Sequence, residues 1–345
     1  MKKIKVLVID DSALVRKILR TELPKNKEIE VVGVAPDPIV GRDKIVELKP
    51  DVIILDIEMP RMDGLTFLEK LMKHYPLPVI ILSSLAKKGG EVALRAMELG
   101  AVEVISKAGT AYSINNMTEQ LIEKIKSVSK IKNLKKLVLK RGNNNVSRIK
   151  GKAMLKTTEK IIAIGASTGG TNAIKDVLIQ LPADMPPILI VQHMPENFTT
   201  AFAKRLNDLC ALEVREAKNN DSAIAGRVLL APGNKHMLLK RSGARYYVEI
   251  KDGPMFFHQK PSVEVLFKSV AKYAGSNAIG VIMTGMGKDG AKGLLEMKEA
   301  GAYTLAQNEK SCVVYGMPKE AVKLGAHNKE IDLLDIPQEL VNKRS

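Results

Sequence analysis

The sequence predicts two α/β domains, each built around a sheet of mostly parallel strands. Short apolar runs alternate with amphipathic, helix-like segments through the first 125 residues, and a second series of the same kind begins at Ile161. A basic stretch rich in Lys and Arg separates the two series. A chain of 345 residues also has the length of two domains, so the division is expected.

The first domain is predicted over residues 1–125, with the pattern of a doubly wound sheet. Its candidate strands are five runs rich in Val, Ile and Leu, at residues 6–9, 31–34, 52–55, 79–82 and 102–105. The last helix is predicted to begin near Thr118 and to continue to Val138. It should end before residues 141–145, RGNNN, because Gly and Asn favour a turn.

The second domain is predicted over residues 158–345. Its candidate parallel strands are five more apolar runs, at residues 161–165, 188–192, 228–231, 278–283 and 303–306. Two further runs, at 237–240 and 246–250, are joined by the turn-forming segment RSGAR and predict an inserted hairpin. Because the other strands alternate with helix-like segments, the sheet should be mostly parallel.

The positive charge of the chain is concentrated between the two domains. The formal net charge is +16, but residues 124–158 hold 12 Lys and Arg and no Asp or Glu, so the other 310 residues carry only +4. A nucleic-acid-binding protein spreads such charge over a folded face or a reading helix. We therefore expect no nucleic-acid partner. The connector, predicted over residues 126–157, is either a solvated spacer or an extended arm for interactions.

The sequence predicts a cytoplasmic protein. The apolar run at the start is interrupted by Lys5 and ends at Asp10, which is too short for the apolar core of a signal peptide. No stretch approaches the roughly 18 apolar residues of a membrane helix. The two cysteines, Cys210 and Cys312, fit neither a disulfide framework nor a zinc site, as expected in a reducing compartment.

Five polar residues are predicted to meet at one edge of the first sheet. Asp10 and Asp11 end the first strand, Asp56 ends the third, Ser83 ends the fourth, and Lys107 follows the fifth. Any single aspartate would be better explained as a helix cap or turn residue, but five residues at four strand ends indicate a site. Carboxylates that repel one another there would be stabilised by Mg²⁺, and a carboxylate beside Mg²⁺ and a lysine can accept a phosphoryl group.

The first domain resembles a response-regulator receiver domain, which has a flavodoxin-like fold. The resemblance covers about the first 120 residues and rests on the segments VLVIDDSALVRKIL, PDVIILDIEMPRMDGLTFLEKLM, PVIILSS and VISK. It implies that Asp56 accepts a phosphoryl group from a histidine kinase. It also implies that Asp11, Asp56 and the Glu58 carbonyl hold Mg²⁺, with Asp10 assisting.

The same resemblance implies that two further residues sense the phosphoryl oxygens. These residues are Ser83 and Lys107. The sequence departs from the receiver pattern at Ala108, where the residue after the lysine is usually proline. This departure leaves the conformation of the following loop open.

The segment IIAIGASTGGT, residues 161–171, joins the first strand of the second domain to a helix-like pattern. A glycine-rich turn at this point can hold a phosphate or present a nucleophilic serine. The segment matches neither G-x-x-x-x-G-K-[ST] nor G-x-G-x-x-G, the patterns of phosphate-binding turns. It does match G-x-S-x-G around Ser167, but a serine before a helix is most often its N-cap. The turn alone leaves both roles for the serine open.

A nucleophilic serine needs a base and a group that orients the base. His193 ends the strand that follows the serine strand, and can reach the same edge of the sheet. Asp289 follows the strand that ends near Met283, although an aspartate there is also a good N-cap for the helix predicted over 290–300. The chain order Ser, His, Asp differs from the usual order in α/β-hydrolases. The other histidines are His74, His236, His258 and His327, and the sequence relates none of them to the serine.

The second domain resembles the catalytic domain of the CheB family of chemotaxis protein-glutamate methylesterases. The segments that carry the resemblance are IGASTGG, VQHM, LAPGNKHM, PSVEVLF, MTGMGKDGAKG and SCVVYGMP. With a receiver in front, the likeness covers almost the whole chain except the connector. It implies a catalytic Ser167, His193 and Asp289, with an oxyanion hole at the backbone N–H groups of Thr168 and Met286.

The resemblance also implies an activity and partners. The activity is hydrolysis of glutamyl methyl esters and deamidation of glutamines on methyl-accepting chemoreceptors, without a cofactor for hydrolysis and under control of receiver phosphorylation. A basic connector could then hold the enzyme near receptor arrays at the membrane, and the spacer interpretation stays open. The alternative class is a two-component transcription regulator. It would need a DNA-reading domain after about residue 150, where strands and the three candidate catalytic residues are predicted instead.

Overall fold

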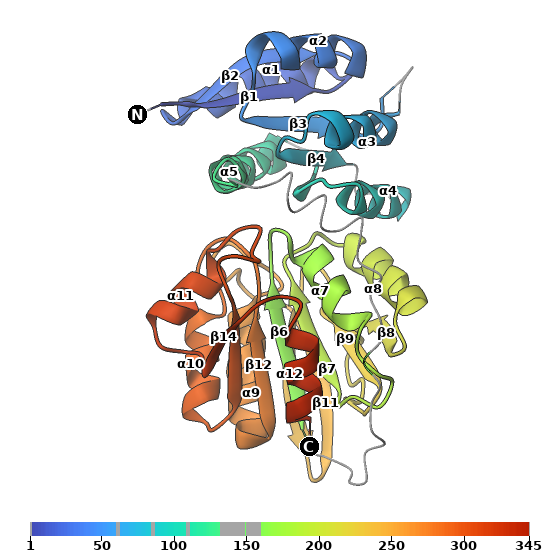
Figure 1. Cartoon of the computed structure of the whole chain (residues 1–345), viewed down its shortest axis with the longest axis vertical. Coiled ribbons are helices and arrows are strands. Elements are labelled where there is room, and N and C mark those ends of the chain that lie inside the picture. Colours follow the sequence, from blue (N-terminus) through green and yellow to red (C-terminus); the bar gives the residue numbers. More distant parts are fainter. Residues whose placement is uncertain are drawn as a thin grey trace. The chain divides into compact units, whose positions relative to one another are not determined.

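The computed structural model describes residues 2–59, 63–83, 87–107, 111–131, 149 and 160–344, without the side chains of 87–89 and 111–116. These residues form two compact units, within Met1–Asn144 and Asn145–Ser345. Each unit has its own parallel sheet (Figure 1). Most of the connector lies outside the described residues, so the limits of 1–125, 126–157 and 158–345 stay a prediction.

The first unit is a five-stranded sheet with the order β2-β1-β3-β4-β5, in which every pairing is parallel. The strands are β1 (Ile4–Ile9), β2 (Ile29–Ala35), β3 (Val52–Asp56), β4 (Val79–Ser83) and β5 (Glu103–Ser106). The helices are α1 (Ala13–Glu22), η1 (Leu23–Lys25, a 3₁₀ helix), α2 (Pro38–Leu48), α3 (Gly64–His74), α4 (Lys87–Glu98) and α5 (Ala111–Val128). This order is that of the flavodoxin-like doubly wound fold. The predicted fold class of the first domain is confirmed.

Local sequence explains where the helices next to the acidic residues begin. The Ser12 hydroxyl accepts the N–H of Val15 and caps α1, and the Asp63 carboxylate accepts the N–H of Leu65 and caps α3. Asp10 and Asp56 therefore do not serve as the N-caps of these helices. The capping explanation is wrong for these two aspartates. The turn explanation fits both, because Asp10 accepts the N–H of Ser12 and Asp56 accepts the N–H of Glu58.

The unbroken helix predicted to reach Val138 is also wrong, because α5 ends at Val128. The Ser129 hydroxyl donates to the Lys126 carbonyl, and the Lys130 N–H turns to the Ser127 carbonyl three residues back. In a continuing α-helix these two carbonyls would accept backbone N–H groups four residues ahead. Because they accept other donors here, the last turn tightens and the helix ends. Residues 132–140 lie outside the described part of the chain.

The second unit is a seven-stranded sheet with the order β14-β13-β12-β6-β7-β9-β8, again parallel at every pairing. The strands are β6 (Ile161–Ala166), β7 (Ile188–Gln192), β8 (Glu213–Glu216), β9 (Arg227–Leu230), β12 (Ala278–Ile282), β13 (Tyr303–Gln307) and β14 (Lys329–Ile331). The hairpin strands are β10 (His236–Ser242) and β11 (Arg245–Lys251), which pair antiparallel. The parallel sheet and the inserted hairpin are both confirmed. The edge strands β8 and β14 were not predicted, because EVRE and KEI bury only one side chain each.

Helices cover both faces of the second sheet. They are α7 (Gly170–Leu178), α8 (Phe198–Leu209), α9 (Val263–Ala274), η2 (Gly275–Asn277, a 3₁₀ helix), α10 (Ala291–Glu299), α11 (Met317–Lys323) and α12 (Ile336–Lys343). α7 contacts α8 and α12, whereas α10 contacts α9 and α11 (Figure 1). The two groups lie on opposite faces because the right-handed crossovers from β6 and from β12 run in opposite directions across the sheet.

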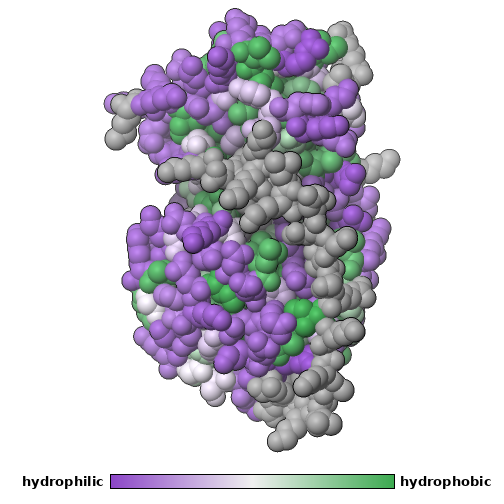
Figure 2. Space-filling view, viewed as in Figure 1, coloured by the Kyte–Doolittle hydropathy of each residue, from purple (hydrophilic) through white to green (hydrophobic). Residues whose placement is uncertain are grey.

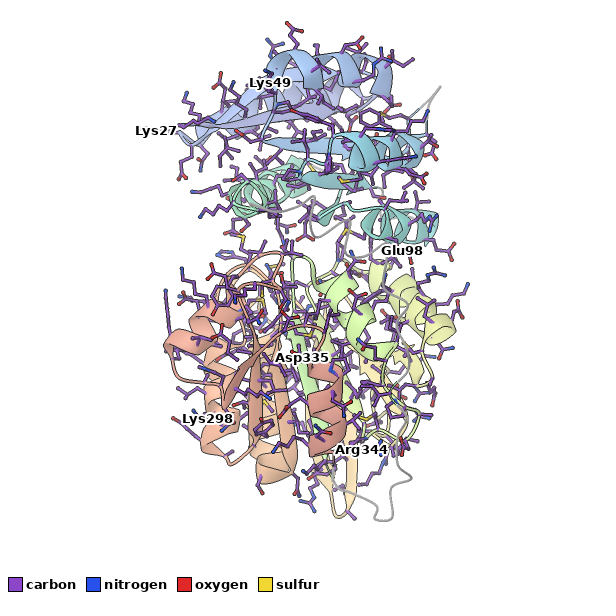
Figure 3. All side chains as sticks on the ribbon, viewed as in Figure 1. Lys27, Lys49, Glu98, Lys298, Asp335 and Arg344 are labelled. Carbon is purple, nitrogen blue, oxygen red and sulfur yellow. The ribbon has the colours of Figure 1, made fainter. Side chains whose placement is uncertain are left out.

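Two long side chains labelled in Figure 3 tie helix ends of the second unit to nearby loops. The Arg344 guanidinium pairs with the Asp184 carboxylate at 2.8 Å, just beyond the end of α12. The Lys298 ammonium donates to the carbonyls of Gly325 and His327 at 2.8 and 3.0 Å. In Figure 2 most of the described surface in view is hydrophilic. Among the helices in the described part of the chain, none combines the length and apolar character needed to cross a membrane.

The topology of the second sheet brings distant segments together at one edge. The chain leaves β6 towards β7 on one side and leaves β12 towards β13 on the other, so the switch point lies between β6 and β12. Ligand sites of open α/β sheets form at the carboxyl ends of strands at such a point. Ser167 directly follows β6, and His193 directly follows β7.

Candidate functional site

Ser167 lies in a tight turn between β6 and α7. Its N–H donates to the Thr284 carbonyl at 3.0 Å, and its carbonyl accepts the Gly170 N–H at 2.7 Å. The N-cap of α7 is Gly169, with φ of 80° and no side-chain cap. A Cβ at Gly169 would lie 2.6 Å from the Val313 Cβ, so both conformation and space require glycine. The Ser167 hydroxyl therefore does not cap this helix, and the capping interpretation is wrong.

Gln192 fixes the turns of Ser167 and His193 against each other. Its side-chain amide donates to the Ser167 carbonyl at 2.9 Å and to the His193 carbonyl at 3.1 Å. The His193 N–H donates to the carbonyl of Ala166, the residue before the serine, at 3.2 Å. All of these groups are buried. The structure thus brings the predicted serine and histidine turns side by side.

Asp289 lies within hydrogen-bond distance of His193, with the Nε2 to Oδ2 distance at 2.7 Å. The carboxylate accepts three further hydrogen bonds, from the Ser262 hydroxyl and from the N–H groups of Val263 and Glu264, at 2.8 to 2.9 Å. Asp289 thus lies at the amino end of α9, while Gly290 is the N-cap of α10 without a side-chain cap. The alternative role of Asp289 as the cap of α10 is wrong.

The surroundings of Asp289 favour its ionised form. Burial raises the pKa of this carboxyl, but the hydrogen bond and charge of His193, together with hydrogen bonds from the Glu264 N–H and the Ser262 hydroxyl, outweigh it and hold the pKa below its usual value. Asp289 therefore remains an anion that only accepts hydrogen bonds. The nitrogen of His193 that faces it must carry the proton.

This arrangement leaves one nitrogen of His193 for chemistry. Nδ1 is buried and has no hydrogen-bond partner among the described residues. The Ser167 hydroxyl is not hydrogen-bonded to His193 here, although the two residues share the Gln192 bridge. The histidine–aspartate contact is therefore formed, whereas the serine–histidine contact is not.

The backbone groups predicted to stabilise an oxyanion flank the serine. The Thr284 hydroxyl donates to the Thr168 carbonyl at 3.0 Å and accepts the N–H groups of Val313 and Val314. A Cβ at Gly285 would lie 2.7 Å from the Ser167 Cβ, so the segment that leads into Met286 passes directly against the serine. The turn and this segment are thereby held in contact.

Three residues that help to build this site were not predicted. Gln192, Ser262 and Thr284 each bond to backbone or side-chain atoms from 25 to 116 residues away. No pattern within the sequence connects such distant partners. The only sequence signal was their place inside segments that carry the family resemblance.

The predicted acidic site of the first unit is also assembled. The Lys107 ammonium lies 2.5 Å from Asp56 Oδ2 and 3.1 Å from Asp10 Oδ2, and both carboxylates are buried. Carboxylate oxygens of Asp10, Asp11 and Asp56 lie within 4.8 Å of one another. Ser83 is buried, and its carbonyl accepts the Lys107 N–H at 2.8 Å, which joins the ends of β4 and β5.

The electrostatics of this site suit a divalent cation. Burial raises the pKa of Asp56 to about 6 and also raises that of Asp10, although Lys107 opposes both shifts. Burial lowers the pKa of Lys107, but the hydrogen bond and charges of Asp56 and Asp10 raise it above its usual value. Two buried carboxylates thus share a single lysine, and the exposed carboxylate of Asp11 lies within 4.8 Å of both. Hard oxygen ligands in such a group fit Mg²⁺.

Magnesium affinity is expected to depend on pH in a defined direction. The pKa of Asp56 is about 6 in the folded protein, above its ordinary value of 3.8, so the folded protein holds this proton more tightly than the unfolded chain does. The resulting contribution to stability is complete below about pH 4 and is lost as the pH rises through about 6. Mg²⁺ and the proton compete for the ionised carboxylate of Asp56. The affinity for Mg²⁺, measured by calorimetry, should therefore weaken about tenfold from pH 7.5 to pH 5. The Asp56→Asn variant should lose most of this dependence. Equal affinity of the parent protein at both pH values would contradict the assignment.

Two predicted features lie outside the described residues. One is the loop that begins at Ala108, where the receiver pattern has proline. The other is most of the basic connector, including residues 132–148 and 150–157. Their roles stay predictions.

Comparison with known proteins agrees with the two predicted domains. The CheB methylesterase family model matches residues 162–340, and the response regulator receiver domain model matches residues 6–119. The crystal structure of the Thermotoga maritima CheB methylesterase catalytic domain has a TM-score of 0.53 and 34% identity, and the match covers 54% of this chain and 99% of that one.

Full-length relatives carry the same two activities in their names. A protein from Syntrophus aciditrophicus (strain SB), named protein-glutamate methylesterase/protein-glutamine glutaminase 2, is 63% identical over 99% of both chains. A protein-glutamate methylesterase/protein-glutamine glutaminase from Bdellovibrio bacteriovorus is 51% identical, over 99% of this chain and 97% of its own. The chain therefore belongs to the CheB methylesterase family and carries a response-regulator receiver domain ahead of its catalytic domain.

Proposed function

We propose that this protein uses Ser167, His193 and Asp289 to hydrolyse glutamate methyl esters of chemoreceptors and to deamidate receptor glutamines. Membership of the family makes it a protein-glutamate methylesterase and protein-glutamine glutaminase. The observation that carries the assignment of residues is the His193–Asp289 hydrogen bond, which leaves Nδ1 buried and without a partner among the described residues, in a turn that Gln192 bridges to that of Ser167.

The positions of the protons in the site suggest one role for each of the three residues. Asp289 accepts a hydrogen bond from the Nε2–H of His193, which keeps the proton on Nε2 and the lone pair on Nδ1. The Ser167 hydroxyl attacks the side-chain carbonyl of the substrate as Nδ1 takes its proton. Asp289 stabilises the imidazolium that forms and does not itself become protonated.

The same site serves both reactions. The imidazolium of His193 gives its proton to methanol or to ammonia as that group leaves, and a glutamyl ester of Ser167 remains. Water then releases the glutamate by the reverse sequence of proton transfers. The N–H groups of Thr168 and Met286 would stabilise the oxyanion, a contribution of about 3 to 4 kcal/mol for one donor.

The receiver domain supplies control. Asp56 would take a phosphoryl group from a histidine kinase, with Lys107 and Ser83 at the phosphoryl oxygens. The Asp10, Asp11 and Asp56 carboxylates, with the Glu58 carbonyl, would hold Mg²⁺, which neutralises the charge of the incoming phosphoryl oxygens. The basic connector would act as a spacer or as a peripheral contact to receptor arrays at the membrane.

The direct test is release of methanol by the purified full-length protein from receptor membranes that carry labelled methyl esters. We expect methanol in the presence of Mg²⁺ and a small phosphodonor, and ammonia from receptors with unprocessed glutamines. Membranes whose receptors have alanine at the methylated positions are the control. A protein that releases neither product, although its receiver domain becomes phosphorylated, would contradict the proposed function.

A further inference from the structure

The second oxygen of the Asp289 carboxylate has its own set of partners. Oδ2 faces His193 and the Val263 N–H, whereas Oδ1 accepts the Ser262 hydroxyl at 2.8 Å and the Glu264 N–H at 2.9 Å. Asp289 is 1% exposed, so water does not replace a lost donor easily. The direction in which Oδ2 faces the histidine therefore depends on how Oδ1 is held.

Ser262 is the only side chain among these Oδ1 donors, and its own position is fixed by His236. The Ser262 N–H donates to His236 Nδ1 at 3.3 Å, and His236 Nε2 lies 2.9 Å from the Pro254 carbonyl. Both contacts require the same tautomer, with the proton on Nε2. The ring of His236 also packs edge-on against Phe256, with the centroids 5.6 Å apart.

The Ser262 hydroxyl has one good acceptor. It accepts the N–H of Val265 only at 3.4 Å, as the N-cap of α9, and it donates to Asp289 at 2.8 Å. A carboxylate accepts hydrogen bonds and does not donate them, so the direction of this bond is determined. A hydrogen bond to a buried charge is also stronger than one to a neutral group.

We propose that Ser262 is a positioning residue of the catalytic site, which acts through Asp289 on His193. The hydroxyl holds Oδ1, Oδ2 is thereby directed at His193 Nε2, and the proton stays on Nε2 so that Nδ1 keeps its lone pair. The chain of contacts is His236, Ser262, Asp289 and His193, drawn from four segments of the second unit. This inference rests on the proposed catalytic roles of Ser167, His193 and Asp289.

The test separates the two possible roles of Ser262 by choice of substituent. Ser262→Ala removes both the cap and the donor to Asp289. Ser262→Gly removes the same hydroxyl but weakens the start of α9 far less than alanine does, because glycine is a much better N-cap residue than alanine. Ser262→Thr keeps both functions. The matched control is Ser269→Ala, which removes a buried serine hydroxyl from the same helix, where it bonds Leu239 N–H and the Leu266 carbonyl far from Asp289.

In the full-length protein with Mg²⁺ and phosphodonor, we expect Ser262→Ala and Ser262→Gly to lower kcat for methanol release about tenfold, with KM unchanged. Ser262→Thr and Ser269→Ala should keep most of the parent kcat. Parent-like activity of Ser262→Gly would show that Ser262 only caps α9, and an equal loss in Ser269→Ala would show a general effect of packing. Either result overturns the inference.

Ser167→Ala, measured in parallel, separates failure of this inference from failure of the proposed function. An inactive Ser167→Ala together with a fully active Ser262→Ala rejects the role of Ser262 alone. An active Ser167→Ala rejects the catalytic site itself.

Discussion

Replacing Ser167 by alanine is expected to abolish methanol release from methylated receptor membranes, with kcat lowered by about 10⁴-fold or more. Ser167 occupies the only G-x-S-x-G turn of the sequence, its hydroxyl does not cap α7, and its turn is bridged to that of His193 through Gln192. Without the hydroxyl the proposed site has no nucleophile. The measurement is the initial rate of methanol release by full-length protein activated with a phosphodonor.

Two controls make this result specific. Ser276→Ala changes an exposed serine in η2, just before β12 and at the opposite edge of the same sheet, and should leave the rate unchanged. Phosphorylation of Asp56 should be unaffected in Ser167→Ala, because the serine and the aspartate belong to different units. Methanol release at the parent rate would remove Ser167 from the mechanism.

The Asp289→Asn variant should behave differently from Ser167→Ala. The aspartate orients and stabilises His193 without forming a bond to the substrate, so some activity should remain. The amide also places N–H groups where the carboxylate accepts four hydrogen bonds, which disturbs the tautomer of His193 as well as the start of α9. An unchanged rate would reduce Asp289 to a structural residue at the end of α9.

Both sheets could be predicted because their central strands are buried on both faces. Strands such as VIILD and VIILS are continuous apolar runs, and their alternation with helices leaves a parallel sheet as the simple solution. The edge strands β8 and β14 bury one side chain each, so they carry no apolar run. The end of α5 depends on hydrogen bonds from the Ser129 hydroxyl and neighbouring backbone groups, and the spacing of apolar residues carries no information about such bonds.

The sequence could predict which residues of the candidate site lie near one another, because the carboxyl ends of parallel strands lie at the same edge of a sheet. Ser167, His193 and Asp289 follow three strands of one sheet, and the rule that sites form at carboxyl ends brings them together without further information. What the rule cannot give is the direction of a side chain. The contact of Asp289 with α9, in place of α10, and the choice of Nε2 as its partner follow from packing of segments far apart in the sequence.

A catalytic fragment that begins near residue 157 is expected to hydrolyse receptor methyl esters faster than the unphosphorylated full-length protein, by roughly fivefold or more. The fragment contains the whole seven-stranded sheet and its core, and the similar Thermotoga maritima catalytic domain has a crystal structure of its own. We therefore expect the fragment to fold without the receiver domain. The comparison is made at equal protein concentration on the same receptor membranes.

The expectation follows from what a receiver can do to an enzyme on the same chain. Phosphorylation of Asp56 changes activity only if it alters the free-energy difference between a less active and a more active arrangement of the protein. If the unphosphorylated receiver inhibits, its removal and its phosphorylation must both raise the rate, and Asp56→Asn must abolish the response to phosphodonor while leaving the fragment unaffected. If the receiver instead activates directly, the fragment will be no faster than the unphosphorylated chain, and only phosphorylation will raise the rate. The rate of the fragment distinguishes the two models, because only an inhibiting receiver domain predicts that its removal raises the rate of hydrolysis.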